Sequence, residues 1–248
     1  MLSPETMHAN WLYALERVAT INSSSTMARV GPWLLLDTGE PAFAAPNSAT
    51  PIGEASASDI DSAVAWFEER SSPFHFALRS DRDSGLCNAL QAKGYAMATP
   101  IRALSLDRPR PPAYDGPLSI REVLDSADIG TYGKVNWPPD QRRTGVAIAE
   151  TAARLGFCLL LGELEGRPVA CSMAVVSDGL VGVYNVGVEE AYRRRGFGAA
   201  MTWAAVAAGL DRGGRSAWLG ASEMGYSLYR RMGFEDRFDY LSLERPGA

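Results

Sequence analysis

A short ending occurs twice in this sequence, and it limits the possible folds more than any other feature. GYAMATPIRALSLDRP begins at Gly94, and GFEDRFDYLSLERP begins at Gly233 with two residues fewer. Each follows an apolar run (PFHFALRS, RSAWLGAS) and a short amphipathic stretch stopped by a glycine, which is typical of a strand followed by a capped helix. Because the order of strand, helix and strand is the same both times, the sequence predicts an internal duplication.

A proline-rich segment lies between the two halves. RPRPPAYDG, residues 108–116, holds three prolines, a glycine and an aspartate, a composition that disfavours both helix and sheet. We therefore expect an N-terminal domain over 1–107, a linker over 108–116 and a C-terminal domain over 117–248. With 248 residues, of which 46% are hydrophobic, the chain is long enough to bury a core.

The second half has a clear order of expected elements. The strand LSIREV precedes helices at about 125–136 and 141–155, which Pro138 and Pro139 separate. FCLLLGELEGRPVACSMAVVSDGLVGVYNVGV contains three β-rich runs broken by EGRP and SDG, which are turn sequences of antiparallel hairpins. A helix at about 197–210, a strand at 215–220, a helix at 223–232 and the repeated ending complete a βααβββαβαβ order. The prediction is an α/β (α+β) fold with a mixed, mostly antiparallel central sheet flanked by helices.

The first half is less regular. Helices are expected at about 4–18 and 59–70 and a strand at GPWLLLDTG, while the turn-rich FAAPNSATPIG allows no assignment. The sequence does not separate core from pocket-lining roles for its aromatic residues, which we expect to be mostly core. They are Trp33, Phe43, Trp66, Phe74 and Phe76.

The charge balance and the rare residues exclude several classes of partner. A net charge of −5 and a pI near 5.2 argue against nucleic acid and against a polybasic membrane contact, and leave small ligands open. Cys87, Cys158 and Cys171 are an odd, scattered set, and the N-terminus lacks a basic leader with an apolar core, so we expect a cytoplasmic location. Two histidines and no CxxC or HxxxH spacing predict no metal site.

Positive charge gathers at one turn of this acidic chain. AYRRRGFGAAMTW, residues 191–203, has three arginines and opens a run of fifteen residues, 196–210, without a charge. The run is shorter than the roughly 20 residues that cross a bilayer, and it predicts a buried helix. An Arg-x-x-Gly-x-Gly motif between a strand and a helix presents free amide groups, a positive helix end and guanidinium groups to an anion. The ligand that fits this arrangement carries a pyrophosphate.

The arginine turn has one structural alternative and two other ligand-binding alternatives. A solvated basic face with glycines that relieve packing is one alternative, because short glycine motifs often occur by chance. A dinucleotide-binding turn requires a glycine almost directly after the strand and a small residue where Met201 stands, and neither condition is met. A P-loop requires Gly-Lys-Ser/Thr, which is absent from the sequence here.

Two motifs resemble one known family. VGVEEAYRRRGFGAAM and, about thirty residues later, SEMGYSLYRRMGF closely resemble the GNAT superfamily of acyl-CoA N-acyltransferases over about residues 118–244. The resemblance implies the acyl-CoA N-acyltransferase fold, with the first half as a degenerate copy in a tandem arrangement. It implies acetyl-CoA or another acyl-CoA as cosubstrate, no metal, and a small-molecule or peptide amine as acceptor. No nucleic-acid or membrane partner is expected, and the protein is expected to be a monomer or homodimer.

The resemblance also implies roles for single residues. The strand that would pair with the pantetheine arm contains Val186, Gly187 and Val188, and Tyr229 matches the tyrosine that protonates the departing thiolate. Ser222 stands where the family usually has an asparagine, which leaves one pantetheine contact in doubt. The residues placed around the pyrophosphate are Arg193, Arg194, Arg195, Gly196, Phe197, Gly198 and Ala199.

The chemistry of acyl transfer agrees with these roles. A free backbone N–H near Val186–Val188 can meet the oxyanion, and a phenol can protonate a thiolate if nearby groups help. Without the resemblance, Tyr229 would be read as an aromatic residue that packs its helix on the sheet. Glu189 and Glu190 are either proton acceptors or counter-charges to the arginines, and neither is named as catalytic.

The sequence thus predicts an N-acetyltransferase that moves an acetyl group to an amine by direct attack on the thioester. The alternatives are a non-catalytic acyl-CoA-binding or sensor protein of the same fold, and a structural or interaction protein without affinity for coenzyme A. The first half lacks the Arg-x-x-Gly-x-Gly motif and has Leu90 where Tyr229 would align, so we expect it to bind no coenzyme A. Trp137 is a modest candidate for the acceptor pocket.

Overall fold

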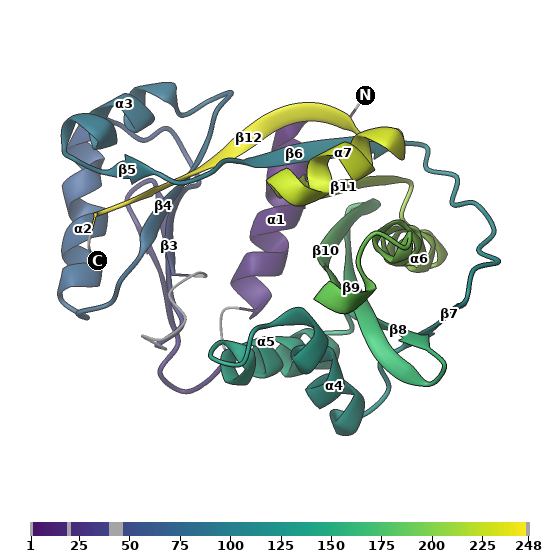
Figure 1. Ribbon diagram of the computed structural model, residues 1–248. Coiled ribbons are helices and arrows are strands. Elements are labelled where there is room, and N and C mark those ends of the chain that lie inside the picture. Colours follow the sequence, from purple (N-terminus) through teal and green to yellow (C-terminus); the bar gives the residue numbers. More distant parts are fainter. Residues whose placement is uncertain (1, 19–20, 40–46, 247–248) are drawn as a thin grey trace. The chain divides into compact units, whose positions relative to one another are not determined.

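The computed structural model describes residues 2–18, 21–39 and 47–246 and divides into two compact units (Figure 1). Among these residues, unit 1 contains 2–18 and 104–237, and unit 2 contains 21–39, 47–103 and 238–246. The start of the chain therefore belongs with the second half, and its end with the first half. At both chain ends the two units differ from the domains expected over 1–107 and 117–248. The expected boundaries describe where the sequence repeat divides, and as domain boundaries they stay a prediction.

Unit 1 has the predicted βααβββαβαβ order, preceded by one helix and one strand from the first half. Residues 108–117, which include the expected linker, form neither helix nor strand. The helices are α1 (Pro4–Val18), α4 (Ser126–Asn136), α5 (Arg142–Arg154), α6 (Phe197–Asp211) and α7 (Glu223–Arg231), and a 3-10 turn, η3, spans Glu190–Tyr192. Five strands lie wholly in unit 1: β7 (Leu118–Glu122), β8 (Cys158–Leu164), β9 (Arg167–Ser177), β10 (Leu180–Val188) and β11 (Ser216–Ala221). Two further strands belong to it in part, because β6 (Ile101–Asp107) ends in unit 1 and β12 (Glu235–Glu244) begins there.

Local signals in the sequence set the ends of these helices. The side chain of Asp125 accepts a hydrogen bond of 2.9 Å from the amide of Asp128 and caps the start of α4. Gly156, Gly213 and Gly233 follow α5, α6 and α7 with φ angles of 76°, 90° and 94°, the left-handed region in which glycine ends a helix.

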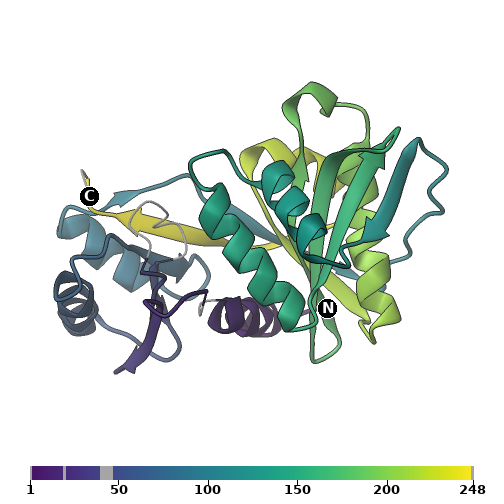
Figure 2. The same cartoon turned by 90° about the horizontal axis from the view of Figure 1, so that it is seen from below.

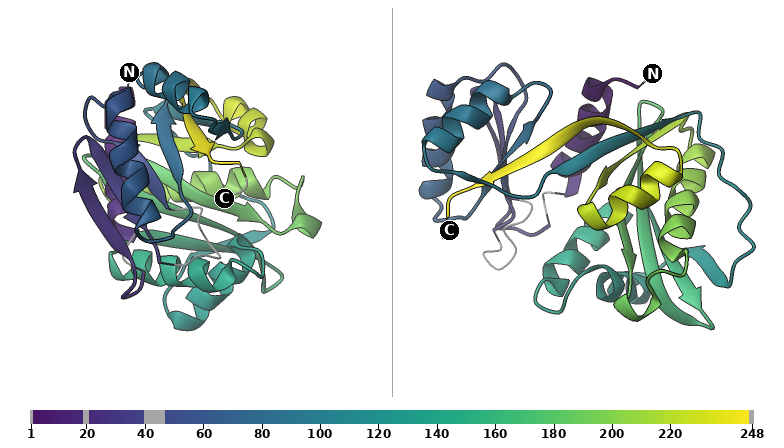
Figure 3. Two further views of the ribbon diagram at one scale, coloured as in Figure 1. Left: turned by 90° about the vertical axis from the view of Figure 1, so that its left-hand side faces the viewer. Right: turned by 45° about the horizontal axis from the view of Figure 1, so that its top comes forward.

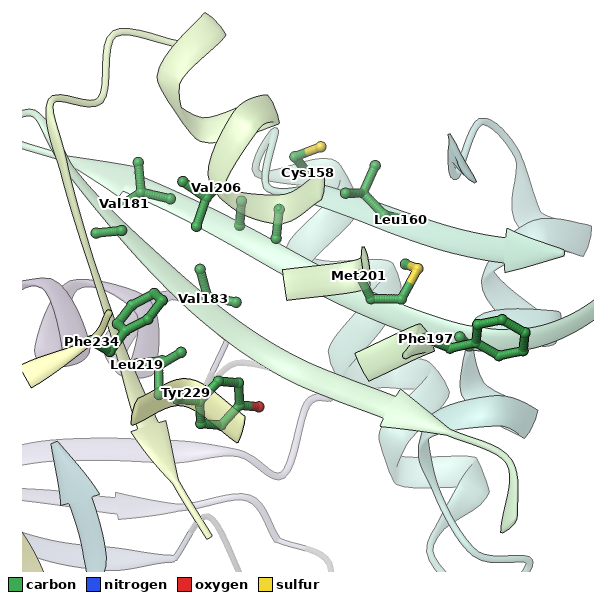
Figure 4. Close-up of a cluster of buried hydrophobic side chains, with 14 of the residues drawn as sticks. Cys158, Leu160, Val181, Val183, Phe197, Met201, Val206, Leu219, Tyr229 and Phe234 are labelled. Carbon is green, nitrogen blue, oxygen red and sulfur yellow. The ribbon is translucent and has the colours of Figure 1, made fainter. Parts of the chain in front are cut away.

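In the sheet of unit 1 the pairs β7–β8, β8–β9 and β9–β10 are antiparallel. Its strand order is β6-β11-β10-β9-β8-β7, and β10 pairs with β11 in parallel. Figures 1 and 2 show α6 and the pair α4–α5 on opposite faces of strands β8–β10. Figure 4 shows the core between α6, α7 and the sheet, where α6 contributes Phe197, Met201 and Val206. A second core joins α1, α4 and α5 to the other face, with Tyr132 and Leu161 fully buried.

The end of β10 departs from regular pairing on both sides. The described ladder with β11 ends at the pair Val183–Leu219. On the other side Tyr184 faces Met173 and Gly187 faces Cys171, so two residues of β10 oppose one of β9. Asn185, in this bulge, has a φ of 53°, a conformation that asparagine tolerates better than most residues.

Unit 2 repeats much of this order. Trp33, Phe67 and Phe76 pack in its core, and Figure 3 shows α2 and α3 beside its strands. Its sheet has the order β1-β2-β3-β4-β12, with β3 and β4 in parallel. Its elements are β1 (Thr26–Val30), β2 (Trp33–Asp37), β3 (Ser48–Pro51), the 3-10 turn η2 (Ala57–Asp59), α2 (Ile60–Glu68), β4 (His75–Arg79), α3 (Ser84–Ala92), β5 (Ala96–Met97), the start of β6 and the end of β12.

The two repeated endings are exchanged. By chain order β6 would close the sheet of the first half and β12 that of the second. Instead β12 lies next to β4 in unit 2, and β6 lies next to β11 in unit 1. Because the two endings are nearly the same in sequence, either strand fits either edge, and the pattern alone does not decide the partner.

One segment of the first half that the sequence left unassigned contains a strand. The segment FAAPNSATPIG contains strand β3, which the turn residues around it concealed. Phe43 lies outside the described residues, while Trp33 and Phe76 are fully buried as expected of core residues. The three cysteines are free and buried. Among the described helices, none has the length and apolar character needed to cross a membrane.

We expect Leu243→Ala to destabilise unit 2, although this residue stands near the C-terminus. Leu243 is fully buried and faces Phe76 of β4, so the substitution should lower the free energy of unfolding by about 2–4 kcal/mol. Urea denaturation followed by tryptophan fluorescence measures the change. The exposed neighbour Glu244, changed to alanine, serves as the control, and equal stability of L243A and wild type would contradict the exchanged strand.

The bulge makes a second prediction. Asn185→Gly should keep the stability of the protein, whereas Asn185→Val should cost about 1–2 kcal/mol, because a β-branched residue resists the left-handed conformation. Thermal unfolding of the two variants side by side measures the difference. If valine were accepted as well as glycine, the backbone at this position would not be left-handed.

Candidate functional site

The arginine turn leads from the end of β10 to the start of α6. Arg193, Arg194, Arg195 and Gly196 are all exposed. Nε of Arg193 donates a bond of 3.1 Å to the carbonyl of Val188, and this bond ties the turn to the strand. The guanidinium of Arg195 lies 5.3 Å from the ring centre of Tyr192. Within the described part of the chain, no carboxylate forms an ion pair with any of the three arginines, so their charge is available to a ligand.

The start of α6 leaves main-chain donors uncommitted. The first helical bond runs from the amide of Ala200 to the carbonyl of Gly196, so the amides of Phe197, Gly198 and Ala199 precede the helical hydrogen-bond pattern. No side chain caps this end. The side chain of Phe197 is buried in the core, so this residue offers only its main chain to a ligand.

Glycine stands at the two glycine positions of the motif, Gly196 and Gly198, for different structural reasons. Gly196 has a φ of 84° and open space around it, so the turn requires glycine for its backbone conformation. A Cβ on Gly198 would lie 3.3 Å from Cδ2 of Leu228, so this glycine allows the first turn of α6 to approach α7 closely. The negative charge of a ligand at this helix end would meet both the amides and the positive end of the helix.

The free edge of β10 lies beside this turn. Val186, Gly187 and Val188 are half-buried and follow the last residue that pairs with β11. A Cβ on Gly187 would lie 3.1 Å from Sγ of Cys171 and 3.2 Å from Oδ1 of Asn136, so the α4 face has no room for a side chain here. The main chain of this segment is therefore the part of β10 that can pair with an extended ligand.

Tyr229 lies in the core beneath α7. It is 8% exposed, and its ring meets that of Phe234 edge-on at 6.2 Å. Gly225, one turn earlier, makes room for the ring, because a Cβ there would lie 2.8 Å from Cε2 of Tyr229. Figure 4 shows the hydroxyl pointing away from Phe234 and Leu219. Burial raises the pKa of Tyr229, and a hydrogen bond with Thr202 opposes this effect, so the phenol is neutral at physiological pH.

Three other residues singled out from the sequence, Ser222, Glu189 and Glu190, lie in described segments. Ser222 follows the last residue of β11, is exposed, and begins α7 without a capping bond from its side chain. Glu189 forms an ion pair of 3.0 Å with Arg167, so its carboxylate is a counter-charge to that arginine. Glu190 is exposed in the turn η3.

The α4 side of the site contains polar groups that the sequence analysis did not identify. Asn136, the last residue of α4, has its Oδ1 3.6 Å from Sγ of Cys171, and this sulfur lies 3.4 Å from the carbonyl of Asn185. Burial raises the pKa of Cys171 to about 12, so the thiol stays protonated and is a poor nucleophile. The ring of Trp137 packs on Gly145 and is half-buried, beside the site on this face.

Some of these residues had a signal in the sequence. An asparagine inside an otherwise β-branched and aromatic strand, as in VYNVGV around Asn185, is a sign of a bulge. Thr202 is the one hydroxyl in the uncharged helix, and its Oγ1 donates 2.8 Å to the carbonyl of Gly198. Asn136 gave no signal, because only the packing of α4 on the sheet brings it to β10.

Unit 2 has no comparable receptor at the matching position. The turn before α2 holds Ser56 and Asp59 in place of arginines, and Oδ2 of Asp59 accepts bonds of 2.8 Å and 2.6 Å from the amide and hydroxyl of Ser56. These bonds lower the pKa of Asp59 and place a negative charge at this helix end. Nη2 of Arg82 donates 3.0 Å to the carbonyl of Pro51, which occupies the end of β3. A second anionic ligand is therefore disfavoured here.

Comparison with known proteins agrees with this geometry. A family model described as "Probable histone acetyltransferase Rv0428c C-terminal" matches residues 13–241. A GCN5-related N-acetyltransferase from Kribbella flavida has a TM-score of 0.76 and 18% identity, covering 100% of this chain and 98% of that chain. A tandem GNAT protein from the clavulanic acid biosynthesis pathway has a TM-score of 0.65 and 13% identity, with the same coverage of 100% and 98%. No match was found among curated proteins.

At these identities the structural likenesses show the fold alone, and they confirm the expected acyl-CoA N-acyltransferase fold with a tandem relative. The family model, in contrast, covers most of the chain and both motifs. The chain therefore belongs to the Rv0428c C-terminal family of acetyltransferases, and its fold is that of the GNAT acetyltransferases it resembles.

Proposed function

We propose that this protein is an N-acetyltransferase that moves the acetyl group of acetyl-CoA to an amine, by direct attack of the amine on the thioester. One observation carries the proposal: three exposed arginines, none of them ion-paired with a described carboxylate, and the three amides that precede the helical hydrogen bonds meet at the start of α6, beside the free edge of β10. This is a receptor for a pyrophosphate next to a strand edge that can bind an amide-containing arm.

The proposed cosubstrate fits the residues present. The amides of Phe197, Gly198 and Ala199, with Arg194 and Arg195, would hold the pyrophosphate. The edge of β10 at Val186–Val188 would pair with the pantetheine arm, which carries two amide groups of its own. Ser222, at the end of β11, replaces the family asparagine, and its exposed hydroxyl can serve as a shorter donor there. No group of histidine, cysteine and acidic residues in the described part of the chain is arranged to hold a metal ion.

The reaction then needs three functions from the protein. The bulge at Asn185 leaves main-chain groups without a strand partner, and an amide there can donate to the carbonyl oxygen as negative charge develops. As the new N–C bond forms and the C–S bond breaks, the amine nitrogen releases a proton to solvent and the departing thiolate takes one from the protonated phenol of Tyr229. Burial raises the pKa of this phenol and makes it a weaker acid, so the transfer needs a nearby positive or hydrogen-bonding group to stabilise the phenolate. Placing amine and thioester in one geometry supplies a large further part of the rate.

The acceptor is an amine, and its class is the open part of the proposal. The α4–α5 side, with Asn136 and the half-buried Trp137, is the face from which it would approach. The name of the matching family points to lysine side chains of basic proteins as one class to test. A non-catalytic acyl-CoA sensor of the same fold is the second candidate, and it would require the same receptor without turnover.

Loss of one arginine should weaken cosubstrate binding. Arg194→Ala removes a charge-assisted contact worth about 1.5–3 kcal/mol, so the Kd for coenzyme A should rise roughly 10- to 100-fold. Isothermal titration calorimetry, or the thermal shift with excess ligand, measures the change. Arg215→Ala, at the opposite end of β11, removes the same charge and should leave the affinity unchanged. Equal affinity of R194A and wild type would remove the pyrophosphate from this turn.

Tyr229→Phe separates the enzyme from the sensor. Thiol release with a panel of amines should fall roughly 10²-fold or more, because the thiolate loses its proton donor, while the Kd for coenzyme A stays within about twofold. The raised pKa of Tyr229 also predicts that wild-type kcat has no alkaline loss from this group until the pH exceeds its usual value of about 10. A wild-type protein that binds acetyl-CoA and releases no thiol with any amine would favour the sensor.

A further inference from the structure

A buried carboxamide from α1 joins the strands of the site just before they separate. Asn10 is 1% exposed and stands on the first helix of the chain, more than 160 residues from every partner. Its Oδ1 accepts 2.8 Å from Nε1 of Trp218 in β11 and 3.0 Å from the hydroxyl of Tyr184 in β10. Its Nδ2 donates 2.7 Å to Oγ of Ser177 and 3.3 Å to the carbonyl of Leu180.

The orientation of this carboxamide follows from its partners. The indole nitrogen of Trp218 is only a donor, so the atom of Asn10 that it meets is the oxygen. The nitrogen of the same side chain then faces the β9–β10 turn, where acceptors lie. Two donors fill the two lone pairs of Oδ1, so this buried group is fully satisfied. The carboxamide supplies both the acceptor and the donors that these partners need.

Asn10, Tyr184 and Trp218 stand at the point where β10 and β11 begin to diverge. The paired registers end at Val183 and Leu219, which follow Gly182 and Trp218, and Tyr184 is the first residue of β10 beyond the ladder. A Cβ on Gly182 would overlap the Asn10 carboxamide, so the glycine makes room for it. The rings of Tyr184 and Trp218 meet edge-on with centres 5.8 Å apart. Tyr184 directly precedes Asn185, the residue with the left-handed backbone.

We propose that Asn10 is a positioning residue for acyl transfer: it holds Tyr184 against Trp218 and thereby fixes where β10 bends away from β11. This inference rests on the proposed function of the same site. The described side-chain hydrogen bonds of Asn10 reach neither the arginine turn nor the free edge of β10 at Val186–Val188. It acts through Tyr184 on the segment Asn185–Val188, whose amides would meet the thioester.

The physical reason is the competition between two arrangements of β10. Without an anchor, the segment after Val183 is free to shift register and to let its amides pair with β11, because a strand edge gains hydrogen bonds by pairing. The anchored Tyr184 opposes this shift, since moving it would break the bond from its hydroxyl to Oδ1 of Asn10 and leave that oxygen with one of its two donors. The first helix of the chain thus keeps the reactive edge of the second half open.

Asn10→Leu and Tyr184→Phe test the proposal, with Ser177→Ala as the matched control. Asn10→Leu keeps a similar side-chain volume without a polar group, and Tyr184→Phe removes only the hydroxyl. Ser177→Ala removes a hydrogen-bond partner of Asn10 on the side away from the point where β10 and β11 diverge. With acetyl-CoA and an accepted amine, kcat should fall at least about tenfold in N10L and Y184F, because the thioester is misplaced. The Kd for coenzyme A, dominated by the pyrophosphate turn, should change less than about threefold, and S177A should match wild type in both.

Hydrogen exchange gives a readout independent of turnover. In N10L and Y184F the amides of 185–188 should exchange at least about tenfold differently from wild type, while those of α6 are unchanged. Should N10L fail to fold, Y184F decides alone. Kinetics and exchange like wild type in Y184F, or a parallel loss of kcat and coenzyme A affinity, would overturn the positioning role. If the wild-type protein transfers no acyl group, the proposed function fails, and the exchange data still decide the role of Asn10.

Discussion

The early end of the parallel pairing between β10 and β11 is the constraint on which the site depends. A strand that stayed paired would use its amides within the sheet and leave no edge for a ligand. The structure ends the ladder at Val183 and places a bulge with a left-handed Asn185 directly after it. Neither feature is local in origin. The divergence needs the two strands held together up to Val183 and released beyond it, and the buried carboxamide of Asn10 stands at that point.

The charge of the site is concentrated, although the chain as a whole is acidic. Three arginines, which form no ion pair with the carboxylates that the structure describes, face solvent at the start of α6, where the amides of the first helical turn precede the helical hydrogen bonds. Concentrating these groups at one helix end gives an anion a strong local field, while the net charge of −5 disfavours extended polyanions. Tyr229 is buried and neutral, because burial raises the pKa of its phenol.

The two units share part of their architecture, but the arginine turn belongs to unit 1. In unit 2 the parallel strand pair and the following helix are retained, but Asp59 occupies the helix start and Arg82 binds the end of β3. Unit 2 therefore has a core of its own, and a carboxylate stands at this helix start where unit 1 has arginines. Each unit nevertheless contains a strand from the other half, so the two halves of the sequence depend on each other for completing their sheets.

The sequence by itself determined the element order of the second half, the helix ends and the arginine turn, because glycine caps, hairpin turns and the motif residues act within a few positions of the chain. It also predicted α1, whose bounds match the expected 4–18. Only the tertiary structure decided which ending completes which sheet, and which residues reach β10 from afar. Two endings of almost equal pattern fit either edge, and the roles of Asn10 and Asn136 arise from helices packing on a distant strand. Such contacts leave no periodic pattern in the sequence, since the sequence alone does not show whether a single asparagine is buried or exposed.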